Sequence, residues 1–337
     1  MKRTLNLPEY VTDALSLPNI SGFEAYVVGG SVRDLYMGLN PYDYDITTNA
    51  KPEEVIAVFA NKYKVFDTGI KHGTVTVMYE NSPIEITTYR IDGNYNDCRK
   101  PENVTFTPNL VDDLKRRDFT VNALVYDGEG EILDYFSGIN DIEAGVIRSI
   151  GNPEHRFSED ALRILRALRF SAKLDFDIDA DTSDAILSMC SFLKNISSER
   201  IFSELSTLFC YGNRVRLNNI LTKYKTVIET ALGLDITTSR YSDICGKSAL
   251  VSCDNNLNFS YYLSSICSGN NQLFGVLKHL KASNAFAKQT VQLFEIHNRI
   301  NEIKNLRDVK MLAKDYGVDF CLTAGEIFAK TNENFYI

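Results

Sequence analysis

Two aspartates separated by one residue, Asp43 and Asp45, stand in the segment YDYDITT. In an extended chain, residues two apart point to the same face, so these carboxylates would lie close together. Like charges at such a separation repel each other unless a cation lies between them. Carboxylate oxygens are ligands that suit Mg²⁺. The pair therefore predicts a divalent cation site, although a solvated edge strand can carry the same pattern.

A third carboxylate, Glu85, lies between Ile84 and Ile86 in the alternating segment PIEITTYR. We expect its side chain to point away from the face that carries the two isoleucines. Three acidic groups near a turn that can hold phosphate favour two-metal phosphoryl or nucleotidyl transfer.

The turn that could hold phosphate is VVGGSVRD, in which an apolar strand ends at Gly29 and Gly30. Glycine lets the backbone turn tightly or approach a ligand. Ser31 and Asp34 have the spacing of a capping box, which predicts Ser31 as the N-cap of a helix. Free N–H groups at the helix start, together with Arg33, suit an anionic ligand. The alternative is a simple turn followed by a surface arginine.

Strands and helices alternate in the first part of the chain. AYVVGG predicts a strand, KPEEVIAVFAN an amphipathic helix, and GTVTVMY with PIEITTYR an antiparallel pair. VDDLKRRDFTVNALVYD predicts a helix that runs into a strand, and the polar segment 92–106 predicts a mobile loop. From Ser158 onward, beginning with SEDALRILRALRFSAKL, the patterns are helical and contain no proline. The sequence thus predicts an α+β protein, with a mixed or antiparallel sheet first and an all-α part second.

Composition limits the classes of protein. The 337 residues carry a net charge of −8, which speaks against a nucleic-acid partner, whereas basic clusters such as Lys115–Arg117 favour one. No apolar run is long enough to span a membrane, and the N-terminal segment lacks the apolar core of a secretory signal. The seven cysteines are scattered, without a CxxC pair. We therefore expect a cytoplasmic protein with reduced thiols and no zinc site.

Five segments resemble, in this order, the class II tRNA nucleotidyltransferases. These are the CCA-adding enzymes and bacterial poly(A) polymerases of the polymerase-beta superfamily. The segments are GGSVRD, DYDITT, IEITTYRIDGNYNDCRKPENVTF, RRDFTVNAL and RFSEDALRILRALRF. The resemblance implies a nucleotidyltransferase catalytic head over residues 1–150, a helical neck with a base-recognition helix over 151–205, and a helical tRNA-binding body over 206–337.

The resemblance also implies roles for individual residues. An RNA 3′-hydroxyl would attack the α-phosphate of a nucleoside triphosphate, helped by Mg²⁺ that lowers the pKa of the hydroxyl and steadies the leaving pyrophosphate. The acidic residues would be catalytic, Asp43 and Asp45 as metal ligands and Glu85 as the third group. The nucleotide would be bound by Gly29, Gly30, Arg33 and Arg117.

Two further pairs concern the sugar and the base. Asp118 and Asn122 would recognise the ribose 2′-hydroxyl, or else serve only capping and packing. Asp160 would accept from the exocyclic amine of C or A, and Arg163 would donate to the adjacent ring acceptor. U and G would leave these groups unpaired, at about 1–3 kcal/mol each. Arg166 and Arg169 would continue this row, and the alternative for Asp160 and Arg163 is an intrahelical salt bridge.

The resulting interpretation is CCA addition to tRNA 3′ ends from CTP and ATP, with the oligomeric state left open. The full-length segment 92–106 favours an enzyme that can add the final A. An A-adding enzyme and a poly(A) polymerase are the alternatives with the same chemistry. An inactive RNA-binding relative would lack the carboxylates, and a small-molecule nucleotidyltransferase would lack the EDALR and RRDFTVNAL segments.

Overall fold

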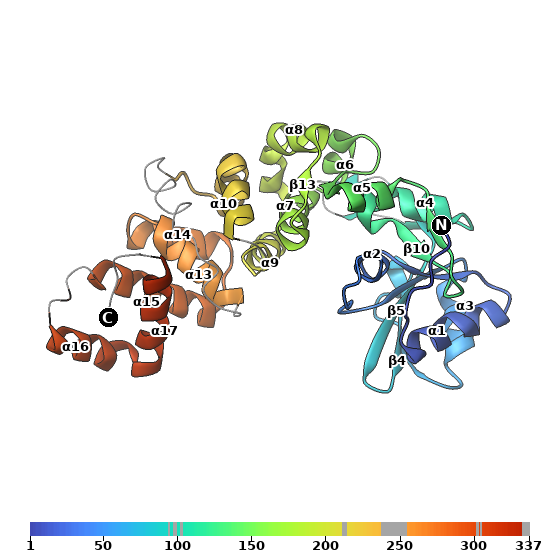
Figure 1. Ribbon diagram of the computed structural model, residues 1–337, viewed down its shortest axis with the longest axis horizontal. Coiled ribbons are helices and arrows are strands. Elements are labelled where there is room, and N and C mark those ends of the chain that lie inside the picture. The colour runs from blue at the N-terminus through green and yellow to red at the C-terminus, as the bar shows by residue number, and fades with distance from the viewer. Residues whose placement is uncertain are drawn as a thin grey trace. The chain divides into compact units, whose positions relative to one another are not determined.

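The computed structural model describes residues 1–93, 95–96, 100–101, 104–210, 214–236, 255–300, 303 and 305–331. The chain divides into two compact units (Figure 1). The first unit comprises Met1–Asp160 and Asp177–Thr182, and the second comprises Ala161–Phe176 and Ser183–Ile337. Each unit is described below by itself.

A seven-stranded sheet forms the centre of the first unit, with the strand order β11-β10-β1-β2-β5-β4-β3. The strands are β1 (Ala25–Val28), β2 (Asp45–Thr48), β3 (Lys64–Phe66), β4 (Thr74–Tyr79), β5 (Ser82–Thr88), β10 (Leu124–Tyr126) and β11 (Ile132–Asp134). Within this sheet β2 and β5 run parallel, and the other neighbours run antiparallel. The mixed sheet places the start of β2 beside the middle of β5.

The helices of the first unit are α1 (Glu9–Ile20), α2 (Gly30–Tyr36), α3 (Pro52–Phe59), α4 (Leu110–Lys115), α5 (Gly138–Ala144) and α6 (Pro153–Glu159), with 3₁₀ turns η1 (Ile70–His72) and η2 (Thr120–Asn122). Helices α1 to α4 pack apolar side chains against the sheet, and two further helices, α5 and α6, complete the unit. α1 and α3 contact each other and pack on the sheet (Figure 1). α3 begins at Pro52, buries Val55 and Phe59, and its Glu54 accepts a hydrogen bond from the Lys51 amide at 2.7 Å. Burying such side chains stabilises the fold by about 1.5–3 kcal/mol each.

The second unit is helical. Its helices are α7 (Leu162–Leu174), α9 (Ser198–Leu208), α10 (Arg214–Lys223), α11 (Lys225–Leu232), α13 (Asn255–Ile266), α14 (Asn270–His279), α15 (Asn284–Ile300), α16 (Leu306–Tyr316) and α17 (Val318–Thr331), with the 3₁₀ helix η3 (Cys190–Asn195). α8 (Ala180–Ser188) begins in the first unit and continues in the second. Aromatic rings of α13, α15 and the C-cap of α9 pack together: Phe209 is stacked on Phe259 at 5.2 Å, and Phe286 lies 5.6 Å from Phe259.

The predicted α+β class is confirmed, and so is the antiparallel pairing of β4 with β5. A membrane-crossing helix is absent from the described part of the chain, since none is both long and apolar enough. A short parallel pair, β12 (Val146–Ile147) with β13 (Asp177–Ile178), adds strand structure beyond residue 158.

Two local predictions were wrong. The helix predicted from Ser158 is broken: α6 ends at Glu159, Asp160 has extended backbone (φ −141°, ψ 101°), and α7 begins at Leu162. The segment 92–106 is not simply a loop. β6 (Arg90–Asp92) pairs with β9 (Val104–Phe106), and β7 (Tyr95–Asn96) pairs with β8 (Lys100–Pro101). Backbone hydrogen bonding between distant residues overrode the polar composition. Residues 94, 97–99 and 102–103 of this segment lie outside those described, and the mobility of the segment stays a prediction.

The close approach of Gly138 to the backbone of Thr120 can be tested by substitution. A Cβ at Gly138 would stand 2.3 Å from the carbonyl oxygen of Thr120, a backbone atom that cannot move aside. We expect Gly138→Ala to lower the free energy of unfolding by about 1–3 kcal/mol, as overpacking does. Gly275→Ala, within α14 and with nothing within 4 Å of its Cβ, should instead stabilise the protein by about 0.5–1 kcal/mol. Urea unfolding midpoints measure both, and an unchanged midpoint for Gly138→Ala would contradict the contact.

Candidate active site

Three carboxylates gather where β2 begins. Asp45 is the first residue of β2, and its register partner on the parallel strand β5 is Glu85. Asp43 lies just before β2 rather than within it, so the prediction that both aspartates belong to a strand holds only for Asp45. All three residues are exposed to solvent. Buried isoleucines flank Glu85 on β5, as the alternating pattern predicted.

The three charges influence one another. Desolvation by the surrounding protein and the negative charge of Asp43 raise the pKa of Asp45 from 3.8 to about 6. The charge of Glu85 adds to this shift, and the charge of Arg117 opposes it. Asp45 still reaches solvent, so desolvation acts on it less than on an enclosed group. The repulsion is the part of the shift that a bound cation would relieve.

The carboxylates do not form a closed metal cage. In the described residues, no group of three or more His, Cys, Asp and Glu side chains is arranged to hold a metal by itself. Mg²⁺ usually binds through one or two carboxylates and completes its shell with water and substrate phosphates. The donor chemistry of Asp43 and Asp45 fits such an open site.

Arg117 lies beside these carboxylates. Its Nη2 donates to Asp113 Oδ2 at 3.4 Å, and its Nη1 would stand 3.2 Å from a Cβ on Gly29. Burial lowers the pKa of Arg117, and the charges of Asp113 and Asp45 counteract part of that effect. Among the described residues, nothing accepts a hydrogen bond from the buried Nε of Arg117. A buried donor without an acceptor costs about 1–3 kcal/mol, so an anion at this position would be stabilising.

Gly29 forms the turn between β1 and α2. Its backbone (φ 82°, ψ −131°) lies in a region that L side chains rarely adopt, and a side chain there would also meet Arg117. The Gly29 amide donates to the Leu124 carbonyl at 2.9 Å, which fixes the turn against the start of β10. This conformation starts α2 at Gly30.

The predicted capping box is therefore wrong. Gly29, not Ser31, is the N-cap, and the Ser31 hydroxyl donates to the Val28 carbonyl at 3.3 Å. The Oδ1 of Asp34 accepts from Nε and Nη2 of Arg33 at 2.8 and 2.6 Å.

Arg33 points inward, with its side chain only 2% exposed. Its Nη1 donates to Asn122, and Asn122 Nδ2 in turn donates to Asp118 Oδ1 at 3.1 Å. Asp118 also accepts from the Phe119 amide at 2.8 Å. The proximity predicted for Asp118 and Asn122 is thus confirmed, while their role toward a ribose stays a prediction. Arg33 stabilises this pair rather than standing free beside Gly30.

The predicted base-recognition residues lie on either side of the boundary between the units. Asp160 ends the main segment of the first unit, and Arg163 is buried on α7 of the second. Arg166 and Arg169 both contact Glu204 of α9, at 3.8 and 2.6 Å. The guanidinium of Arg169 also lies 4.2 Å from the ring centroid of Phe170. These two arginines thus connect α7 to α9, a contact that sequence reasoning missed.

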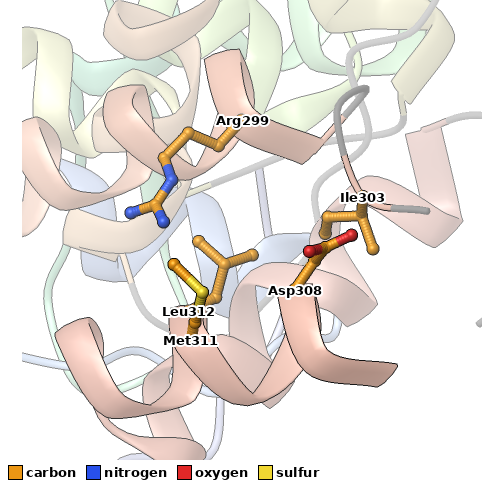
Figure 2. Close-up of a pocket in the computed structure, with 5 residues that line it drawn as sticks. All are labelled: Arg299, Ile303, Asp308, Met311 and Leu312. Atoms are coloured by element: carbon orange, nitrogen blue, oxygen red, sulfur yellow. The ribbon is translucent and has the colours of Figure 1, made fainter. Parts of the chain in front are cut away.

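A pocket in the second unit contains none of the predicted residues. It has a volume of about 180 Å³ and lies between α15 and α16. Figure 2 shows Met311 and Leu312 of α16 on the side opposite Arg299 of α15. Arg299 is engaged with Asp315 at 3.0 Å. The lining residues are Arg299, Ile303, Asp308, Met311 and Leu312.

Known proteins resemble both parts of the chain. Residues 25–148 match the model of the poly A polymerase head domain, and residues 175–225 match a model described as a probable RNA- and SrmB-binding site of polymerase A. The CCA-adding enzyme of Ligilactobacillus salivarius is 37% identical over 338 residues, which cover 96% of this chain and 79% of that enzyme. The chain belongs to the CCA-adding enzyme family. Members of this family are nucleotidyltransferases, which generally depend on a metal.

Two further relatives define the extent of the match. The CCA-adding enzyme of Lactobacillus johnsonii is 50% identical over 202 residues, which are 59% of this chain and 50% of that enzyme. The matched part thus spans about half the length of that relative. The CCA-adding enzyme of Bacillus stearothermophilus, solved with CTP, has a TM-score of 0.82 at 29% identity, covering 96% of this chain and 78% of that one. The CCA-adding enzyme fold therefore extends over both units.

The raised pKa of Asp45, caused by desolvation and by repulsion from Asp43, predicts a pH-dependent stability. The folded-state pKa of Asp45, about 6, exceeds the ordinary 3.8, so the folded protein loses stability as the pH rises through this interval. Asp45→Asn removes the charge and should raise Tm above about pH 6, with the gain vanishing below about pH 4.

Thermal melts in EDTA across this pH range measure the effect. Asp67→Asn, an exposed aspartate of the same unit, is the matched control and should give no such gain. A gain for Asp45→Asn that is the same at every pH would contradict the interpretation.

Proposed function

We propose that the chain adds CCA to the 3′ end of tRNA from CTP and ATP without a nucleic-acid template. The observation that carries this proposal is the meeting of Asp45, Glu85 and Arg117 beside the Gly29 turn. The carboxylates of Asp45 and Glu85 lie near the guanidinium of Arg117, whose Nε lacks an acceptor among the described residues. Such a site suits a metal-bound triphosphate. The CCA-adding activity named for the relatives supports this substrate class.

We assign the metal site to Asp43 and Asp45, with Mg²⁺ as the ion. When bound, the ion would lower the pKa of the attacking 3′-hydroxyl and offset charge on the pyrophosphate. Glu85, in register with Asp45, is the third acidic group of the site. Arg117 offers Nε and Nη1 to the triphosphate, and the glycine turn of Gly29 and Gly30 admits the phosphates close to the backbone.

Recognition of the sugar and base is assigned to two further sets of residues. Asp118 and Asn122 present a hydrogen-bonded pair to the ribose, held in place by Arg33. Asp160 and Arg163 select C and A by their hydrogen-bonding pattern. Arg166 and Arg169, on the same helix α7 as Arg163, support this base recognition. The helices beyond residue 205 contact tRNA. We place the enzyme in the cytoplasm.

The acceptor experiment tests the proposed function. The protein is incubated with Mg²⁺, each nucleotide in turn, and tRNA transcripts ending at the discriminator base, at CC or at CCA. Addition of CCA to the bare end is the expected result. A single A added only to the CC end would identify an A-adding enzyme, and long A tails on any RNA a poly(A) polymerase. No incorporation with any transcript would overturn the proposal.

The carboxylates should be indispensable for this addition. Asp43→Ala and Asp45→Ala each remove a metal ligand, so nucleotide addition should fall by at least about a hundredfold, in line with the several kcal/mol that a metal supplies. The fold should persist, because both side chains are exposed. Gel-resolved primer extension measures the rates, with Asp67→Ala as the control. Full activity in the double variant Asp43→Ala/Asp45→Ala would exclude the assigned metal site.

Arg163 should affect base choice more than rate. Arg163→Lys keeps the charge but loses the planar donor pair, so discrimination against U and G should fall about tenfold, within the range that unpaired polar groups supply. The measurement is kcat/KM for CTP, ATP, UTP and GTP, with Arg148→Lys, at the ion pair to Asp141, as the control. Unaltered selectivity in Arg163→Lys would contradict its assignment to the base.

A further inference from the structure

Asp113, on α4, is a fully buried carboxylate with partners from several elements. Its side chain is 0% exposed. Oδ1 accepts from Arg116 Nη2 and Nε at 2.8 and 2.9 Å and from the Arg90 amide at 3.3 Å. Oδ2 accepts from Arg117 Nη2 at 3.4 Å and lies 3.2 Å from the Thr47 hydroxyl. One carboxylate thereby connects α4, β2 and the start of β6.

These partners border the candidate active site. Thr47 is two residues beyond Asp45 on β2. Arg90 begins β6 directly after β5, the strand of Glu85. Arg117 places its Nη1 at the Gly29 turn. A displacement of Asp113 would therefore change the positions of both Arg117 and strand β2, which carries Asp45.

The charge of Asp113 is shared unequally between the two arginines. Burial alone would raise the pKa of Asp113, but the positive charges of Arg116 and Arg117 outweigh it and lower the pKa. Arg116 makes the shorter contacts, whereas Arg117 makes a single contact at 3.4 Å. Asp113 thus orients Arg117 through one of its nitrogens, and Nε, which has no acceptor among the described residues, is left for another anion.

We propose that Asp113 is a positioning residue that holds the Arg117 guanidinium at the Gly29 turn and fixes its distance from the acidic strand β2. The inference rests on the proposed function, because it gives Arg117 the triphosphate as its ligand. An arginine side chain loses rotamer entropy when it is ordered, and contact with a buried carboxylate orders the side chain before the nucleotide arrives. Asp113 itself touches neither substrate nor metal.

Asp113→Asn tests the proposal, since asparagine keeps the size but loses the charge and one acceptor oxygen. The KM for CTP and ATP should rise about tenfold, as loss of a charged hydrogen bond predicts, while kcat falls less. Asp112→Asn, next to it on α4 with a Lys115 contact at 3.9 Å, is the matched control and should change KM less than about twofold. A KM within twofold of wild type for Asp113→Asn would overturn the proposal.

A double-mutant cycle separates positioning from general structural support. If Asp113 acts through Arg117, Asp113→Asn should add little to the loss in Arg117→Lys, so the effects on kcat/KM are non-additive. If the fold-losses in kcat/KM of the two single variants multiply in the double variant, the role of Asp113 is merely structural and the proposal is overturned. Thr47→Val serves if Asp113→Asn fails to fold, because it removes the contact of Asp113 with β2; it also removes the contact of the Thr47 hydroxyl with the Thr87 carbonyl at 3.3 Å. It should raise KM more than Asp112→Asn does, and no rise would count against the proposal.

The proposed function and the role of Asp113 can fail separately. If the wild-type protein adds no nucleotide, the proposed function fails. The affinity for CTP is then measured by calorimetry for the same set of Asp113 and Arg117 variants. Coupling between Asp113 and Arg117 in CTP affinity would support positioning without catalysis. Additive effects, or no CTP binding by the wild-type protein, would overturn it.

Discussion

The parallel pairing of β2 with β5 is the constraint on which the rest of the site depends. It sets Asp45 opposite Glu85, while the antiparallel pairing of β1 with β2 sets Val28, the residue before the glycine turn, opposite Asp45. Register in a sheet is strongly specified when one face is buried, because a one-residue slip would turn every side chain over. The fully buried Ile46, Ile84 and Ile86 thus hold the acidic groups in place although they have no chemistry of their own.

Electrostatic balance then decides what the site can accept. Asp43, Asp45 and Glu85 repel one another on one side, and the guanidinium of Arg117 faces them from the other. Asp113 keeps Arg117 at that position from the protein interior. Both unfavourable features, the crowded carboxylates and the unsatisfied Nε, are relieved by the same kind of ligand, an anion that brings cations with it. A nucleoside triphosphate with its metal has that character.

Sequence patterns predicted which side chains lie together on one strand or turn better than they predicted contacts between distant segments. Asp45, Glu85 and the pair Asp118–Asn122 could be predicted, because alternation on a strand and spacing on a turn are local properties. The N-cap at Gly29 and the break at Asp160 were missed, since both follow from backbone conformations that neighbouring segments impose. The contacts of Arg169 with Glu204 and of Asp113 with Thr47 join residues 35 and 66 positions apart, and no local period encodes them.

Gly29 carries a consequence for how this chain can evolve. Its positive φ and the nearby Arg117 each disfavour a Cβ. Every single-base change of a glycine codon that alters the amino acid either introduces a Cβ or stops translation. The codon for Gly29 can therefore drift only silently while Arg117 is retained, and even loss of Arg117 would leave the backbone conformation as a second barrier. In copies of this gene that no longer serve catalysis, an amino-acid change here would be an early record of that loss.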